Sequence, residues 1–326
     1  MRYMRKSLPV LLAIVLAVTL LAPTAFAGGA RSADGFGSQA YAYVQQLQEV
    51  PRFVAAPGGE MAAASMVKGW MADYGYSPRF QRFSFNHKGT KYDSQNVVAY
   101  KKTSHRHGHG ADVPLVIIGA HYDAVPAGKG ADDNASGLGT MLEVVGRLSE
   151  EDLPYDLAIV AFGAEEAGLI GSDYYVKQMS QQNIKRTIVM INFDSLIAGD
   201  FRYIHAGFNR KTWARDAMLE IIDRLDLGII TQPGLNKKYP AGFTPNGFSD
   251  YTAFNKKGMP IVAFESTNWS VGDLDGYQQT ALPPYEFWHT ENDVLEIIEG
   301  YYPGRPLAHL HAYTELVYTF LSELEP

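Results

Sequence analysis

Three short apolar runs constrain the fold of this chain more than any other feature. They span residues 115–120, 157–162 and 188–193, and each is continuous and rich in β-branched residues. Such runs are typical of strands that are buried on both faces of a sheet. Stretches with helical spacing, 135–149 and 169–182, separate them. This alternation predicts a mainly parallel sheet that is covered by helices.

The remaining segments extend this pattern on both sides. Helical spacing is found over 38–50, 59–74, 213–225, 250–255 and 307–324, and strand-like runs over 79–85, 96–101 and 260–264. The 326 residues are long enough for two domains, but no internal repeat or linker divides them. We therefore expect one domain over residues 38–326. Its predicted fold class is α/β, a three-layer α/β/α sandwich around a mixed, mainly parallel central sheet.

Residues 1–27 are expected to be a cleaved signal peptide. Arg2, Arg5 and Lys6 precede an apolar run over 8–21, and Ala25-Phe26-Ala27 has the small-x-small pattern of a cleavage site. A membrane anchor needs about 20 apolar residues, which is more than this run provides. We therefore expect a secreted or periplasmic protein without a stable membrane anchor. The Gly-rich stretch 28–37 would be the flexible start of the mature chain.

The composition excludes several kinds of site and partner. Cysteine is absent, so disulfides, thiolate metal sites, iron–sulfur clusters and a cysteine nucleophile are excluded. Any transition metal would be held by His, Asp and Glu. The formal net charge of −7 gives the chain no general electrostatic attraction to nucleic acid or to anionic membranes.

Ionisable residues follow each of the three apolar runs directly, and a further acidic segment lies in the loop that leaves the first. In open α/β sheets, ligands bind beyond the carboxyl ends of the strands. Taken singly, these residues also suit turns, helix caps or helix starts. Taken together, they would repel one another unless cations were bound. Zinc suits such ligands, as do cobalt and manganese. The side chains concerned are His121, Asp123, Asp132, Asp133, Glu165, Glu166 and Asp194.

Five separate motifs resemble the M28 family of zinc peptidases, over about residues 40–325. They occur in the order typical of the family, and each falls in the expected strand or loop. The resemblance implies the zinc-dependent exopeptidase fold. The motifs are His121-Tyr122-Asp123; Gly130-Ala131-Asp132-Asp133-Asn134-Ala135-Ser136-Gly137; Glu165-Glu166-Ala167-Gly168-Leu169-Ile170-Gly171-Ser172; Asn192-Phe193-Asp194 with Ser249-Asp250; and His289-Thr290 with Asp293.

The resemblance implies two zinc ions per chain. Asp133 would bridge them, Glu166 and His289 would complete one site, and His121 and Asp194 would complete the other.

It also implies catalytic roles for two carboxylates. Glu165 would be the general base that takes a proton from the metal-activated water. Asp123 would hold the imidazole of His121 through its second nitrogen. The leading hypothesis is an exported zinc aminopeptidase that acts on the N-termini of peptides or proteins.

Three other functions are found among relatives with this fold. The first is a carboxypeptidase or dipeptidase. A carboxypeptidase would need a basic pocket for the substrate carboxylate, and the regions that could supply one contain Arg202, Arg210, Lys237 and Lys238. A glutaminyl cyclase would use one zinc, whereas His121 and Asp194 complete a second site. A receptor ectodomain that has lost its metals would also lack some of the metal-binding side chains, and this sequence lacks none of them.

Several positions depart from the family pattern or stand outside it. Tyr251 occupies a position where many relatives carry His. Trp288 occupies a position where some relatives carry Tyr. The indole of Trp288 would either donate a hydrogen bond to the reacting group or form a wall of the pocket. His105, His107 and His109 are expected to decorate an exposed loop. Candidate pocket residues are Trp269, Tyr277, Tyr285, Phe287 and Trp288, and the segment 242–247 with Phe243 and Phe248.

Overall fold

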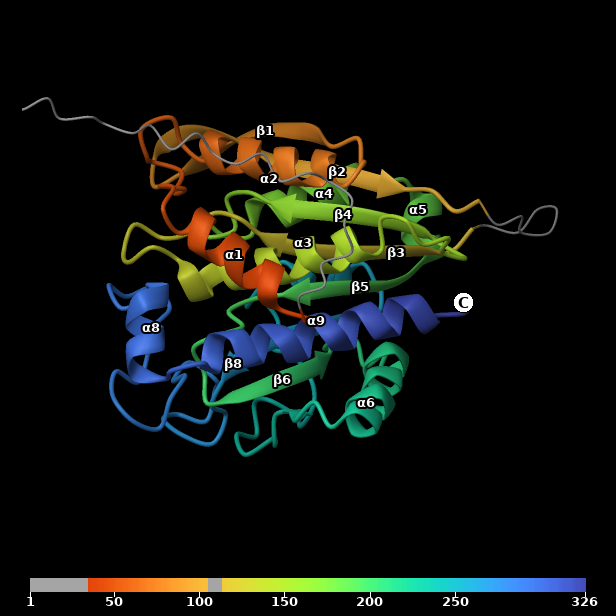
Figure 1. The fold of residues 1–326 in the computed structure, drawn as a ribbon. Helices are drawn as coiled ribbons and strands as arrows, with labels where there is room; N and C mark the ends of the chain where they lie inside the picture. Colours follow the sequence, from red (N-terminus) through yellow and green to blue (C-terminus); the bar gives the residue numbers. More distant parts are fainter. Residues whose placement is uncertain (1–34, 105–112) are drawn as a thin grey trace, which may run out of the picture.

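The computed structural model describes residues 35–104 and 113–326, and an eight-stranded sheet forms their centre (Figure 1). The strand order is β1-β2-β4-β3-β5-β8-β6-β7. The expected signal peptide and the histidines at 105, 107 and 109 lie outside the described residues. The strands are β1 (Arg79–His87), β2 (Thr90–Lys101), β3 (Leu115–His121), β4 (Asp156–Phe162), β5 (Thr187–Phe193), β6 (Phe201–Ala206), β7 (Ile229–Ile230) and β8 (Ile261–Thr267).

The four central strands are parallel, and the flanking strands make the sheet mixed. β4, β3, β5 and β8 run in the same direction, whereas β2 pairs antiparallel with β4 and β6 antiparallel with β8. Every residue of β3 and β4 is buried, because helices cover both faces of the sheet there. The predicted mixed, mainly parallel sheet is therefore confirmed.

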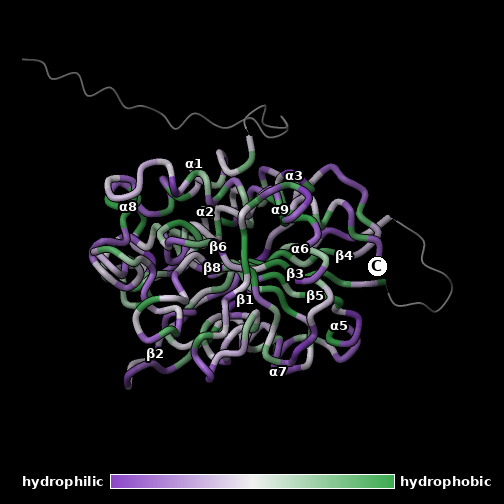
Figure 2. The backbone as a smooth tube through the Cα atoms, turned by 90° about the horizontal axis from the view of Figure 1, so that it is seen from below, coloured by the Kyte–Doolittle hydropathy of each residue, from purple (hydrophilic) through white to green (hydrophobic). Residues whose placement is uncertain are grey.

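Helices form one layer on each face of the sheet (Figure 2). One face is covered by α1, α2, α3, α6 and α9, whose buried side chains share a core with the apolar residues of β3 and β5. The other face is covered by α4 and α7, with α5 at the start of β5. The helices are α1 (Ser38–Leu47), α2 (Met61–Asp73), α3 (Gly137–Arg147), α4 (Ile170–Gln178), α5 (Gln181–Arg186), α6 (Trp213–Leu225), α7 (Tyr251–Lys256), α8 (Leu295–Tyr301) and α9 (Arg305–Glu323).

Most predicted elements agree with the structure to within a few residues, and the differences have local causes. The helix predicted over 135–149 begins as a π-helical turn, Ala131–Ser136, before α3. The helix predicted over 169–182 is divided into α4 and α5, where Ser180 caps the second through Asn183. β6, β7 and α8 were not predicted from the sequence. β6 lacks a continuous apolar run, and α8 has only seven residues.

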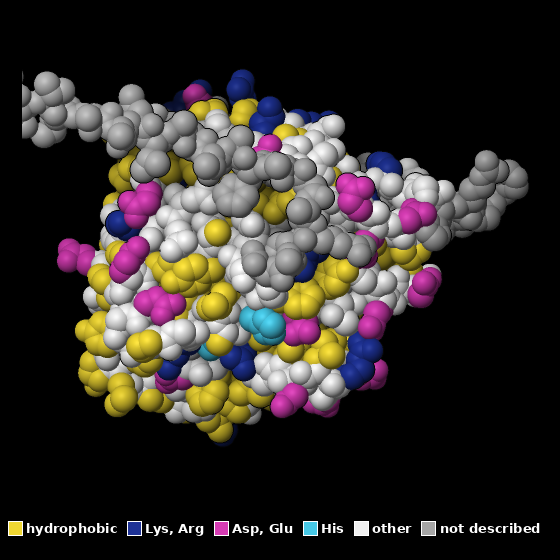
Figure 3. All heavy atoms as spheres, in the orientation of Figure 1, with side chains coloured by type: hydrophobic (Ala, Val, Ile, Leu, Met, Phe, Trp, Pro, Cys, Tyr) yellow, Lys and Arg dark blue, Asp and Glu magenta, His cyan; other side chains and the backbone are white. Residues whose placement is uncertain are grey.

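The first described residues belong to the folded unit. The ring of Phe36 lies under the guanidinium of Arg147 and packs against Tyr318. Among residues 35–104 and 113–326, no helix has the length and apolarity needed to cross a membrane. On the face shown in Figure 3, Lys and Arg side chains are scattered among acidic ones.

Candidate metal centre

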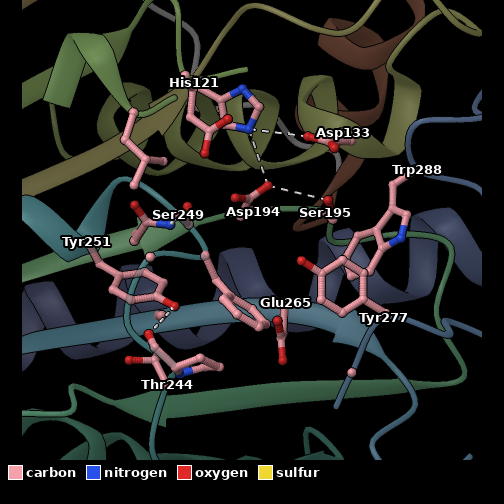
Figure 4. A pocket seen from close by; sticks show the side chains of 18 of the residues that line it. His121, Asp133, Asp194, Ser195, Thr244, Ser249, Tyr251, Glu265, Tyr277 and Trp288 are labelled. Carbon is pink, nitrogen blue, oxygen red and sulfur yellow. Dashed lines mark hydrogen bonds and ion pairs between the residues drawn. The ribbon is translucent and has the colours of Figure 1, made fainter. Parts of the chain in front are cut away.

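The carboxyl ends of the parallel strands converge on one cavity of about 500 Å³ (Figure 4). His121 is the last residue of β3, Asp194 follows β5, and Glu165 and Glu166 lie in the turn after β4. Asp133 comes from the π-helical turn that precedes α3. His289 lies in the loop before α8, so a segment distant in sequence completes the cluster. The structure brings all of these predicted residues together.

The carboxylate of Asp133 faces two histidines with different oxygens. Its Oδ1 lies 3.2 Å from Nε2 of His121, and its Oδ2 lies 3.2 Å from Nε2 of His289. Asp194 Oδ1 is 3.3 Å from the same His121 nitrogen. Glu166 Oε2 is 3.0 Å from the same His289 nitrogen. Two groups of three potential ligands therefore share Asp133.

These groups fit divalent cations by chemistry and by spacing. In each, one imidazole and two carboxylates place ligand atoms within 4.8 Å of one another. Two ligands at about 2.0–2.1 Å from a tetrahedral zinc ion would lie about 3.3 Å apart, close to the separations found here. Glu166 also has a buried oxygen, Oε1, without a hydrogen-bond partner in the part of the chain that the structure describes. The donor set therefore suits zinc.

The pKa values of the clustered side chains also favour a bound cation. Hydrogen bonds with Asp133 and Glu166 raise the pKa of His289 to about 11. Burial, with the charge of Asp133, raises the pKa of Glu166 to about 7. Burial likewise raises the pKa of Glu165 well above its usual value. Without a cation the cluster therefore retains protons, and a bound cation would replace them.

Asp123 lies behind the cluster and contacts it differently from the expected arrangement. Nδ1 of His121 is 3.2 Å from the backbone oxygen of Asp123 and 3.6 Å from its carboxylate. The carboxylate instead accepts hydrogen bonds of 3.1 Å from the backbone N–H groups of Glu165 and Glu166. Asp123 is thus placed to position the Glu165–Glu166 turn as well as the imidazole.

Asp293 and Arg52 hold the segment that carries Asp133. The carboxylate of Asp293 accepts hydrogen bonds from the backbone N–H groups of Asp132 and Asp133. The buried guanidinium of Arg52 donates to the carbonyl oxygens of Lys129 and Gly130. Burial lowers the pKa of Arg52 to about 10, while the surrounding carboxylates favour its charged form. No motif in the sequence pointed to Arg52, because only the fold brings it to this loop.

Some of the candidate pocket residues line the cavity and others do not. Tyr277, Trp288 and Phe248 form part of its wall, together with Thr244, Pro245 and Gly247 of the predicted rim. Trp269 and Phe287 are buried, and Tyr285 is exposed outside the lining. Phe243 packs under Arg210 and Arg215. Tyr251 reaches the wall, but its hydroxyl donates to the backbone of Pro245.

The basic residues considered for a carboxylate pocket lie elsewhere. No Lys or Arg is among the described residues that line the cavity. Arg202 donates to the carbonyl oxygens of Leu227 and Gly228. Glu265 on β8 and His205 on β6 also line the cavity. Neither was predicted, because no sequence motif marks them.

Comparison with known proteins agrees with the motifs. Residues 96–305 match the sequence profile of Peptidase family M28. Alkaline phosphatase isozyme conversion protein of Escherichia coli (strain K12) is 32% identical over 273 residues, which cover 76% of this chain and 78% of that protein. Aminopeptidase YwaD of Bacillus subtilis (strain 168) is 28% identical over 214 residues, 64% of this chain but 41% of that protein.

Solved structures share the fold. The zinc aminopeptidase BSAP from Bacillus subtilis has a TM-score of 0.69 at 18% identity, covering 90% of this chain and 97% of that one. Glutaminyl cyclase of Porphyromonas gingivalis has a TM-score of 0.64 at 21% identity, covering 89% and 98%. These identities establish the architecture and leave the reaction open. The sequence match and the converging motifs identify the chain as a member of peptidase family M28.

Proposed function

We propose that this chain is an exported aminopeptidase that uses two zinc ions to remove residues from the N-termini of peptides. Membership of peptidase family M28 makes it a hydrolase of peptide bonds. The observation that carries the finer proposal is the Asp133 carboxylate, whose two oxygens face two separate ligand groups. Aminopeptidases among the relatives support the same activity.

Asp133 would bridge the two ions. Glu166 and His289 would complete one site, and His121 and Asp194 the other. Bound zinc supplies Lewis-acid chemistry, because it lowers the pKa of water and polarises a carbonyl.

Glu165 is the group best placed to move the proton. Its carboxylate lies with His121 and Glu166 at the cluster, and its raised pKa suits a base that later acts as an acid. It would take a proton from the attacking water and give it to the leaving amine. Asp123 would keep Glu165 in place through the backbone hydrogen bond.

The charge of the cavity favours a substrate amine over a substrate carboxylate. Seven Asp and Glu residues line it, and no Lys or Arg is among the described residues there. The carboxylates of Glu165 and Asp194 would hold the free N-terminal ammonium. A carboxypeptidase would bring its substrate carboxylate into a cavity of like charge, which is unfavourable.

The test is hydrolysis of free and N-acetylated aminoacyl p-nitroanilides by the purified protein. We expect cleavage of the free-amine substrates alone, loss of activity with a chelator, and recovery with zinc. Equal cleavage of the N-acetylated substrates, or activity that survives complete metal removal, would overturn the proposal. Export is a separate part of the proposal. It is tested by N-terminal sequencing of the protein recovered outside the cytoplasm. A chain that retains residues 1–27 would contradict signal cleavage.

A further inference from the structure

The cavity contains a carboxylate that the proposed reaction does not use. Glu265 lies on β8, two residues after Ala263, so both side chains leave the sheet on the same face and line the cavity. In Figure 4 it lies on the side of the cavity away from His121 and Asp133. Its side chain is 20% exposed, which leaves it accessible from the cavity.

One oxygen of Glu265 is fixed by two donors. Oε1 accepts a hydrogen bond from the indole Nε1 of Trp269 at 2.5 Å and lies 2.9 Å from Nε2 of His205. No partner of Oε2 is found among the hydrogen bonds of the described residues. The carboxylate is therefore held rigidly, with one oxygen left for a ligand.

His205 contacts Glu265 through one ring nitrogen only. Its Nδ1 is buried and has no hydrogen-bond partner within the described structure. A proton on Nδ1 would be a buried donor without an acceptor, which is costly, so Nε2 is the nitrogen that donates to Glu265. The ion pairs of the described residues give Glu265 no Lys or Arg partner. Among the described residues, no Lys or Arg side chain therefore competes with a ligand for this carboxylate.

A chain of aromatic rings connects the metal cluster to this carboxylate. Trp288, which precedes the ligand His289, contacts Tyr277, and Tyr277 contacts Phe248. The rings continue through Tyr239 to Trp269, the residue that donates to Glu265. Of these rings, Trp288, Tyr277 and Phe248 line the cavity. Such a wall suits the methylene stem of a long side chain and the cation at its end.

We propose that Glu265 makes this cavity selective for a basic N-terminal residue, Lys or Arg. The side-chain cation would pair with Oε2, while the aromatic wall would cover the aliphatic stem. This inference rests on the proposed aminopeptidase activity and adds the side-chain class of its substrate.

The test compares kcat/KM for p-nitroanilides of arginine, lysine, norleucine and leucine. Norleucine keeps the four-carbon stem of lysine without the ammonium. In the wild-type protein we expect lysine to exceed norleucine by at least about tenfold. In Glu265→Gln we expect lysine and arginine to fall by about 100-fold, while norleucine and leucine change less than about threefold. The Gln variant retains an oxygen that can accept from Trp269.

The matched control is Glu286→Gln, which removes a carboxylate from an exposed part of the same cavity lining. Solvent screens such a charge, so the lysine-to-norleucine ratio should stay within about twofold of the wild type. If Glu265→Gln weakens all substrates equally, the carboxylate binds the α-ammonium instead and the proposal is wrong. If the wild type cleaves norleucine as well as lysine, basic selectivity fails while the aminopeptidase activity stands. If no free-amine substrate is cleaved, both proposals fail.

Discussion

Gln279 and Asp132 are joined by a hydrogen bond of 2.6 Å, from Nε2 to Oδ2, across 147 positions of sequence. The amide oxygen of Gln279, Oε1, accepts hydrogen bonds from the backbone N–H groups of Phe287 and Trp288. One side chain therefore ties the segment that carries Asp133 to the segment that carries His289. We infer that it sets the spacing between these two ligands.

Gln279→Ala should weaken zinc binding because it frees the loop before His289. The expected loss of affinity is about 10–100-fold, typical of residues that orient metal ligands. The measurement is competition with a chromogenic chelator, which reports metal affinity without depending on activity. Gln278→Ala is the matched control, since the side-chain amide of Gln278 donates to the backbone of Thr280. Equal zinc affinity in the two variants would show that Gln279 does not position His289.

Glu165→Gln and Glu166→Gln should separate proton transfer from metal binding. Glu165→Gln is expected to lower kcat by about 10²–10⁴-fold and to keep its zinc, because the amide cannot accept the proton of water. Glu166→Gln is expected to lose zinc as well, because its oxygen lies at the His289 group. Zinc content by mass spectrometry and kcat on the same samples check both. Full activity in Glu165→Gln would remove Glu165 from the mechanism.

The sequence predicted the centre of the fold because its signals are local. Each buried strand is a continuous apolar run, and the residue that follows it necessarily lies at the carboxyl edge of the sheet. His121 and Asp194 could therefore be placed together without a structure. No strand pattern placed His289 at this edge, so its role was predicted from the family motif alone.

The supporting residues could not be predicted because their roles exist only in tertiary contacts. Arg52, in the loop between α1 and α2, reaches Gly130, and Gln279 reaches Asp132 across 147 positions of sequence. Glu265 lies in a strand whose other residues are mostly apolar, where a single acidic residue is ordinary. No spacing in the sequence marks any of these contacts.

Gly199→Ala should destabilise the protein because β8 approaches the loop before β6 closely. A Cβ at Gly199 would lie 2.2 Å from the backbone of Ser266 and Thr267. Backbone in a paired strand moves less readily than a side chain, so the expected loss is about 3 kcal/mol of unfolding free energy. Gly69→Ala is the control, since Gly69 is exposed in α2 with nothing within 4 Å of a new Cβ. It should stabilise the helix by about 0.5–1 kcal/mol. Thermal unfolding of both variants tests this, and equal midpoints would contradict it.

His309 should make the protein less stable as the solution becomes acidic. Burial, with the charges of Arg202 and Arg305, lowers the pKa of His309 from 6.5 to about 3. Its Nδ1 lies 3.2 Å from the backbone oxygen of Leu196, to which the neutral ring donates. Between pH 6.5 and about 3 the unfolded chain therefore binds one more proton than the folded chain. The unfolding free energy should fall with decreasing pH in this window, by up to about 1.4 kcal/mol per pH unit from this group.

His309→Asn should flatten this pH dependence while keeping a side-chain N–H for the backbone of Leu196. Its unfolding free energy at pH 7 should be lower, because the smaller side chain leaves space in the core. Urea unfolding at several pH values between 4 and 7 measures the slope for each protein. His311→Asn serves as the control, since His311 is 48% exposed on the same helix and should leave the slope unchanged. An equally steep slope in His309→Asn would assign the acid sensitivity to other groups, because the variant has no imidazole at this position to bind the proton.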